Sequence, residues 1–143
     1  MYKLCAFQRK MRAHEFEREI WLRADPASAS VAREFAGDAA EDVGCDHAAT
    51  EACRLAISEA VANAVEHGAP CDNGLISVAV YLEARCLTSE IRDCGDFKAA
   101  RQPANLLEER GRGLPLMFAV MDHVEIDAVP GRTVVRLAKR LPG

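Results

Sequence analysis

The sequence predicts an α/β (α+β) protein built as a two-layer sandwich, in which helices cover one face of a mainly antiparallel, mixed sheet. Two observations support this prediction. Apolar and β-branched stretches occur in two pairs, each joined by a short link, which indicates two β-hairpins. Before the first hairpin, apolar residues recur at helical spacing over two long stretches. Helices that accompany paired hairpins most simply cover one face of the resulting sheet.

The first elements are expected to be an edge strand and a helix. Residues 14–24 alternate loosely between apolar and charged side chains, which is typical of an edge strand. Asp25 is expected to cap the following helix, and Pro26 suits the first helical position. Gly44 is expected to end this helix.

The second helix is expected to begin at Asp46 or Thr50 and to end at Gly68 and Pro70. A turn, a hairpin, a polar connection, an apolar helix and a second hairpin should follow. The expected ranges are 71–74 for the turn, 75–82 and 86–91 for the first hairpin, 97–110 for the connection, 113–121 for the helix, and 123–128 and 133–138 for the second hairpin.

Length and composition favour one domain with a sizeable core. Half of the 143 residues are apolar, and we expect residues 14–143 to form the domain and residues 1–13 a short basic arm. The net charge of -4 gives no electrostatic reason to expect nucleic-acid binding. There is no apolar run of bilayer length and no signal-peptide core, so we expect a cytoplasmic protein without a membrane contact.

The six cysteines are scattered, with no Cys-x-x-Cys pair and no cysteine–histidine cluster at zinc spacing. We therefore expect reduced, mostly structural thiols rather than a disulfide framework. The cysteines are Cys5, Cys45, Cys53, Cys71, Cys86 and Cys94.

An acid and an amide stand out in the second helix. Glu59 and Asn63 are four residues apart and therefore project from one side, with His67 close to the same side. A carboxylate there can accept a proton, and a carboxamide oxygen can coordinate a hard cation such as magnesium. The alternative is a solvent-facing polar stripe, which is common on surface helices.

Two further motifs carry possible chemistry. Asp93 and Gly95 follow a strand, where the carboxylate can accept a hydrogen bond from an exocyclic amine; the alternative is an ordinary Asp-x-Gly turn. Gly111 and Gly113 precede an apolar helix, where bare N–H groups suit a phosphate. Arg110 or Arg112 adds a charged donor beside them, or the segment is a plain hinge.

Taken together, these motifs resemble the GHKL ATP-binding superfamily and, within it, the small anti-sigma-factor serine kinases of bacteria. Residues 59–68 resemble the N box, and Asp93-Cys94-Gly95 resembles the start of the first glycine box. Residues 111–114, which end at Leu114, resemble the second glycine box, and residues 131–135 resemble the closing Gly-x-Thr strand. The resemblance implies the Bergerat ATP-binding fold, with ATP and Mg²⁺ as cofactors.

The resemblance also implies roles for single residues. Glu59 would be the general base that activates a serine hydroxyl, Asn63 would ligate magnesium, and Asp93 would bind the adenine amino group. Residues 97–110 would form a lid over ATP. Separately from the resemblance, we expect Arg101 in this lid to reach the γ-phosphate. The other expected nucleotide-binding residues are His67, Gly95, Arg110, Gly111, Arg112, Gly113 and Leu114.

The implied function is a protein serine kinase that phosphorylates a STAS-domain anti-anti-sigma factor, with a sigma factor as a competing partner and a homodimer as a plausible assembly. The first glycine box is short here, because Asp96 leads straight into Phe97, and Asp96 adds negative charge near the expected phosphates. This favours an alternative, a regulatory binding module without kinase activity. The catalytic domain of a two-component histidine kinase fits less well, since no phospho-accepting helical hairpin is evident.

Overall fold

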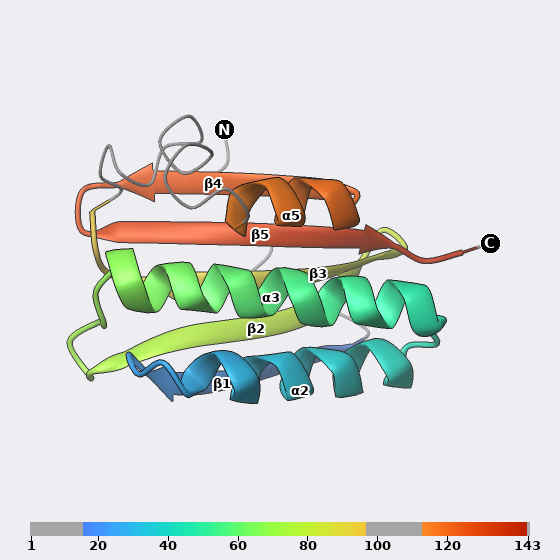
Figure 1. Ribbon diagram of the computed structural model, residues 1–143, viewed down its shortest axis with the longest axis horizontal. Helices are drawn as coiled ribbons and strands as arrows, with labels where there is room; N and C mark the ends of the chain where they lie inside the picture. The colour runs from blue at the N-terminus through green and yellow to red at the C-terminus, as the bar shows by residue number, and fades with distance from the viewer. Residues whose placement is uncertain (1–15, 97–112, 143) are drawn as a thin grey trace.

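A computed structural model describes residues 16–96 and 113–142, which form a sheet with helices over one face (Figure 1). The elements in chain order are β1 (Glu17–Arg23), α2 (Ser28–Asp42), α3 (His47–His67), β2 (Leu75–Glu83), β3 (Cys86–Asp93), α5 (Gly113–Val120), β4 (His123–Val129) and β5 (Arg132–Arg140). This order confirms the predicted two-layer α/β sandwich. The expected arm at 1–13 and the connection at 97–110 lie outside the described residues.

The sheet has five strands in the order β1-β2-β3-β5-β4, so β1 lies at an edge as expected. All four neighbouring pairs of described strands are antiparallel. The prediction of a mixed sheet, which would include parallel pairs, is therefore wrong for these strands. Figure 1 shows α2 and α3 side by side over one face of the sheet, with α5 next to α3 and in contact with β4.

Helix α2 begins later than expected. Its first residue is Ser28, whereas Asp25 and Pro26 were expected to cap and start it. Asp25 instead accepts a hydrogen bond from the Ala27 backbone N–H through Oδ1 at 2.8 Å, and its carbonyl accepts one from the Ser28 N–H at 2.9 Å. The short aspartate side chain closes a local turn, which competes with the helix for the same backbone groups.

The other helix ends follow the expected signals. Gly44 adopts φ +93°, a conformation that favours glycine, and its N–H donates to the Glu41 carbonyl at the end of α2. Asp46 rather than Thr50 opens α3, since its Oδ1 accepts the Ala49 N–H at 2.8 Å. Gly68 caps the other end of α3.

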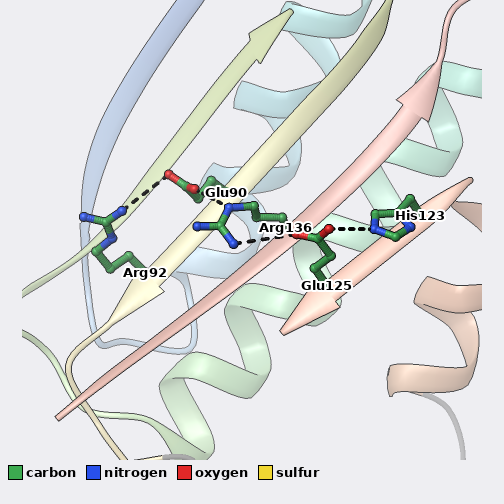
Figure 2. A network of polar contacts seen from close by, with 5 residues as sticks. All are labelled: Glu90, Arg92, His123, Glu125 and Arg136. Atoms are coloured by element: carbon green, nitrogen blue, oxygen red, sulfur yellow. Dashed lines mark hydrogen bonds and ion pairs between the residues drawn. The ribbon is translucent and has the colours of Figure 1, made fainter. Parts of the chain in front are cut away.

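The sheet face away from the helices carries a chain of ion pairs across three strands (Figure 2). Arg136 on β5 donates through Nε to Glu90 on β3 at 2.8 Å and lies 3.7 Å from Glu125 on β4. His123 lies 2.8 Å from Glu125, and Arg92 lies 3.6 Å from Glu90. The Arg136 side chain is buried, so its charge needs these carboxylates to offset the loss of water.

The apolar core lies between the helices and the opposite face of the sheet. Ile57 and Val61 of α3 pack there with Val78 of β2 and Ile91 of β3, and none is more than 1% exposed. Side chains alternate along each strand, so every second residue of the central strands enters this layer. Within the described ranges, no helix is long and apolar enough to cross a membrane.

We expect Ile57→Ala to lower the free energy of unfolding by about 2–5 kcal/mol, because it removes a buried side chain and leaves a cavity. Val31→Ala on the exposed side of α2 is the control and should change it by less than about 0.5 kcal/mol. Urea unfolding followed by circular dichroism measures both. Equal losses in the two variants would contradict the placement of the core.

Candidate functional site

Three segments that are distant in sequence meet at one end of the sheet. They are the end of α3, the loop after β3 and the turn between β4 and β5, at the left of Figure 1. The Cys94 N–H donates to the Ala69 carbonyl at 2.8 Å, which joins the loop to the end of α3. The Asp96 Oδ1 accepts the Gly131 N–H at 2.5 Å, which joins the loop to the β4–β5 turn.

Asp93 lies at the centre of this junction and is 1% exposed. Its Oδ1 accepts the Gly95 N–H at 2.9 Å. A Cβ added at Gly68 would lie 2.6 Å from the Asp93 carboxyl carbon, so the end of α3 can pack this closely only with glycine there. A carboxylate can accept several hydrogen bonds at once, and the Gly95 N–H provides one for Asp93. A carboxylate is also the kind of group that accepts a hydrogen bond from an amine.

Gly95 is required for a second close approach. A Cβ on Gly95 would lie 2.8 Å from the Ala69 nitrogen and 2.9 Å from the Gly68 carbonyl carbon. The Gly95 carbonyl accepts a hydrogen bond from Thr133 Oγ1 at 3.1 Å, and Thr133 is fully buried opposite Asp93 in the β3–β5 register. These contacts fix the backbone on both sides of the Asp93 carboxylate.

No role of its own was predicted for Thr133 from the sequence, and Gly68 was expected to end the helix and to close the segment that resembles the N box. The Gly-x-Thr pattern at 131–133 was a usable signal for Thr133, but its position opposite Asp93 depends on a strand register that the pattern does not fix. The tight packing of Gly68 depends on where β3 ends in space. Neither contact follows from local sequence.

The helix α3 presents Glu59 and Asn63 on its half-buried side, while Ile57, Val61 and Ala64 are buried on the other. This is the orientation that the four-residue spacing predicts. The His67 side chain is about a quarter exposed, and its Nε2 lies 3.5 Å from the Glu66 carboxylate. The described residues form no group of three or more His, Cys, Asp or Glu side chains able to hold a metal.

The helix α5 begins at Gly113, as expected, and includes Leu114 in its first turn. It packs beside α3 on the same face of the sheet (Figure 1), so the helix that follows the second glycine motif adjoins the helix with the acid and amide. The remaining predicted site residues lie outside the described residues. They are Arg101, Arg110, Gly111 and Arg112.

Asp96 is positioned by the β4–β5 turn. Its hydrogen bond to the Gly131 N–H directs one carboxylate oxygen to that backbone, a contact that the sequence did not suggest. A hollow of about 330 Å³ lies beside the turn, and its lining includes Asp96, Ala128, Val129 and Pro130. Part of the negative charge of Asp96 is therefore compensated by a backbone donor.

The expectation of reduced thiols is wrong for one pair, because Cys71 and Cys94 form a disulfide with a Cα–Cα distance of 4.8 Å. The β2–β3 hairpin brings them together. Ser77 pairs with Arg92 near the open end of the hairpin, and the turn before β2 folds Cys71 back so that its N–H donates to the Leu75 carbonyl. Cys71 and Cys94 are therefore far apart in sequence but adjacent at the open end of this hairpin.

The other described cysteines, Cys45, Cys53 and Cys86, are free thiols as expected. Cys53 lies in the core, and burial raises the pKa of its thiol to about 12. Burial is also the main cause of the raised pKa of Cys45, followed by the nearby Asp46 carboxylate. Both groups therefore carry little thiolate at neutral pH.

Comparisons with known proteins point to one family. Residues 22–139 match the family model described as a histidine kinase-like ATPase domain. A protein named anti-sigma F factor from Thermoanaerobacter sp. (strain X514) is 36% identical over 95 residues, which cover 60% of this chain and 66% of that protein. Another of the same name from Geobacillus kaustophilus (strain HTA426) is 35% identical over 98 residues, covering 62% and 67%.

The first of these matches spans slightly less than two thirds of the relative's length. Among solved structures, one described as the RsbU and RsbW domains of Rv1364c from Mycobacterium tuberculosis superposes with a TM-score of 0.70 at 28% sequence identity. The superposition covers 91% of this chain and 34% of that chain. The five-stranded antiparallel sheet and its helical layer are therefore a known arrangement.

Proposed function

Because the chain belongs to the histidine kinase-like ATPase domain family, we propose that it is an ATP-dependent protein serine kinase and an anti-sigma factor. The observation that carries the proposal is the buried Asp93 carboxylate, held between Gly68 and Gly95 beside the end of α3. A buried acceptor between two bare stretches of backbone suits the amino edge of a flat base such as adenine.

The residues present fit magnesium-bound ATP. The carboxamide oxygen of Asn63 is a hard ligand, and Mg²⁺ commonly takes one or two protein oxygens and completes its shell with phosphates and water. The first N–H groups of α5 have no partner within the helix and project outward from its N-terminal end, where they suit phosphate oxygens. When bound, ATP supplies the γ-phosphoryl group that is transferred.

The catalytic role falls to Glu59 in this proposal. Its carboxylate lies on the half-buried side of α3, one helical turn before Asn63. There it would orient a serine hydroxyl and accept its proton as the phosphoryl group is transferred. Asn63 would hold the metal, so proton transfer and charge neutralisation would be supplied by adjacent turns of one helix.

We propose a STAS-domain anti-anti-sigma factor as the substrate and a sigma factor as the competing partner, in the bacterial cytoplasm. The support is the name anti-sigma F factor shared by relatives that are 36% and 35% identical to this chain. A homodimer, the roles of Arg101, Arg110 and Arg112, and the arm at 1–13 stay predictions.

A second candidate is a regulatory module that binds its partner without phosphoryl transfer. The observation that favours it is the short first glycine box, in which Asp96 follows Gly95 directly and is engaged with the β4–β5 turn. Calorimetry with Mg·ATP separates the two candidates. An absence of binding at millimolar nucleotide would favour the module and contradict the kinase.

We expect Glu59→Ala to lower phosphoryl transfer to a cognate STAS-domain protein by about 10²- to 10⁴-fold, because the general base is lost. Binding of Mg·ATP should change much less. Glu51→Ala, which removes an exposed carboxylate near the start of the same helix, is the matched control and should keep most of the transfer rate. Labelled-phosphate transfer measures both variants, and equal rates for Glu59→Ala and wild type would remove Glu59 from this role.

We expect Asp93→Asn to weaken ATP binding by about 10- to 100-fold, because an amide has one acceptor oxygen where the carboxylate has two. One oxygen is needed for the Gly95 N–H, so the adenine amino group loses its acceptor. The new amide N–H₂ should also reduce the preference for ATP over GTP, since guanine presents a carbonyl at the same ring position.

Titration calorimetry with ATP and GTP tests this prediction. Asp96→Asn is the control, because its carboxylate oxygen is engaged with the Gly131 N–H rather than with Gly95. It should bind ATP within about threefold of wild type. An Asp93→Asn protein that keeps both the affinity for ATP and the discrimination against GTP would show that adenine binds elsewhere.

A further inference from the structure

The Cys71–Cys94 disulfide lies directly against the proposed nucleotide site. Cys94 follows Asp93 in the chain, and Cys71 is three residues beyond Gly68. The bond therefore ties the loop that carries Asp93 and Gly95 to the segment that leaves α3. The two cysteines are 23 residues apart in sequence, and the whole β2–β3 hairpin lies inside the closed loop.

Non-covalent contacts hold the same loop. One is the hydrogen bond from the Cys94 N–H to the Ala69 carbonyl at 2.8 Å. Another is the packing of Gly95 on the backbone of Gly68 and Ala69. The hydrogen bonds from Thr133 Oγ1 to the Gly95 carbonyl and from the Gly131 N–H to Asp96 hold the loop to β5 and to the β4–β5 turn. All of these contacts are non-covalent and can break and re-form. A covalent bridge beside them restricts the loop and so preserves the position of the Asp93 carboxylate.

The bridge is also placed where a small reductant can reach it. Cys71 and Cys94 are both partly exposed, whereas Cys53 is buried in the core. Cys45 and Cys53 carry little thiolate because burial raises the pKa of each thiol, so they compete poorly in thiol–disulfide exchange. In the cytoplasm that the proposed function implies, disulfides are usually transient and either catalytic or redox-sensing.

We propose that the Cys71–Cys94 disulfide is a reversible redox control of nucleotide affinity, with the oxidised form binding Mg·ATP more tightly. This inference rests on the proposed function. The reductant is a dithiol: it gives two electrons and two protons, the sulfur–sulfur bond breaks, and Cys71 and Cys94 become thiols while the reductant becomes a disulfide. The loop then keeps only its non-covalent contacts, so more of its motion has to be restricted when nucleotide binds, which lowers affinity.

The test is titration calorimetry with Mg·ATP on the oxidised protein and on protein reduced with dithiothreitol. We expect reduction to weaken binding by about 3- to 10-fold, the range that ordering a few side chains and a short loop produces. Alkylation and mass spectrometry should show two more labelled cysteines after reduction, and a thermal melt should show that the reduced protein remains folded.

Two variants control the experiment. Cys86→Ser keeps the bridge and should respond to dithiothreitol as the wild type does. The double variant Cys71→Ser/Cys94→Ser should bind as reduced wild type does and should not respond. The comparison of oxidised and reduced wild-type protein needs no substitution. It therefore tests the redox control even if the double variant folds poorly.

Each other result contradicts the proposal in a recognisable way. Equal affinity in the oxidised and reduced proteins overturns the redox control and leaves the proposed function intact. Tighter binding after reduction overturns it as well. An absence of binding in both states overturns the proposed function and, with it, the control that rests on it.

Discussion

The buried carboxylate of Asp93 is the constraint on which the rest of this site depends. At 1% exposure, an acid needs hydrogen bonds in place of water, and the Gly95 N–H supplies one of them. That bond requires the loop after β3 to turn back sharply. This tight turn requires glycine at positions 68 and 95, because a Cβ at either position would lie within 3 Å of other atoms. One polar group thus sets the residue type at two other positions.

The sheet explains how such a group is held in place. On β5, Leu137 faces the helices and is fully buried, while its neighbour Arg136 faces the other way into the ion pairs of Figure 2. Thr133 lies on the helix side of the same strand, where its hydroxyl reaches the Gly95 carbonyl. Apolar packing on one face and charge pairing on the other therefore hold the register that puts Thr133 opposite Asp93.

Most of the fold could be predicted because its signals are local. The four-residue spacing of Glu59 and Asn63 was sufficient to orient α3, and glycines such as Gly44 marked helix ends. The start of α2 was missed because the Asp25 side chain can serve either a helix cap or a tight turn, and sequence does not decide between them.

The candidate site could be predicted only in part because its remaining contacts are long-range. The contact of Gly68 with Asp93, the hydrogen bond of Thr133 to Gly95 and the Cys71–Cys94 bridge all depend on which strand ends meet. The bridge was mispredicted for a second reason as well. Cysteine spacing and an expected reducing compartment both argued against a disulfide. Neither of them indicates that the β2–β3 hairpin brings Cys71 and Cys94 together.

The most direct test of the account is a crystal structure of the protein with Mg²⁺ and a non-hydrolysable ATP analogue. We expect the adenine amino group within hydrogen-bonding distance of an Asp93 carboxylate oxygen, and the metal within coordination distance of the Asn63 side-chain oxygen. A nucleotide bound elsewhere on the molecule, with Asp93 contacted only by the protein, would contradict it.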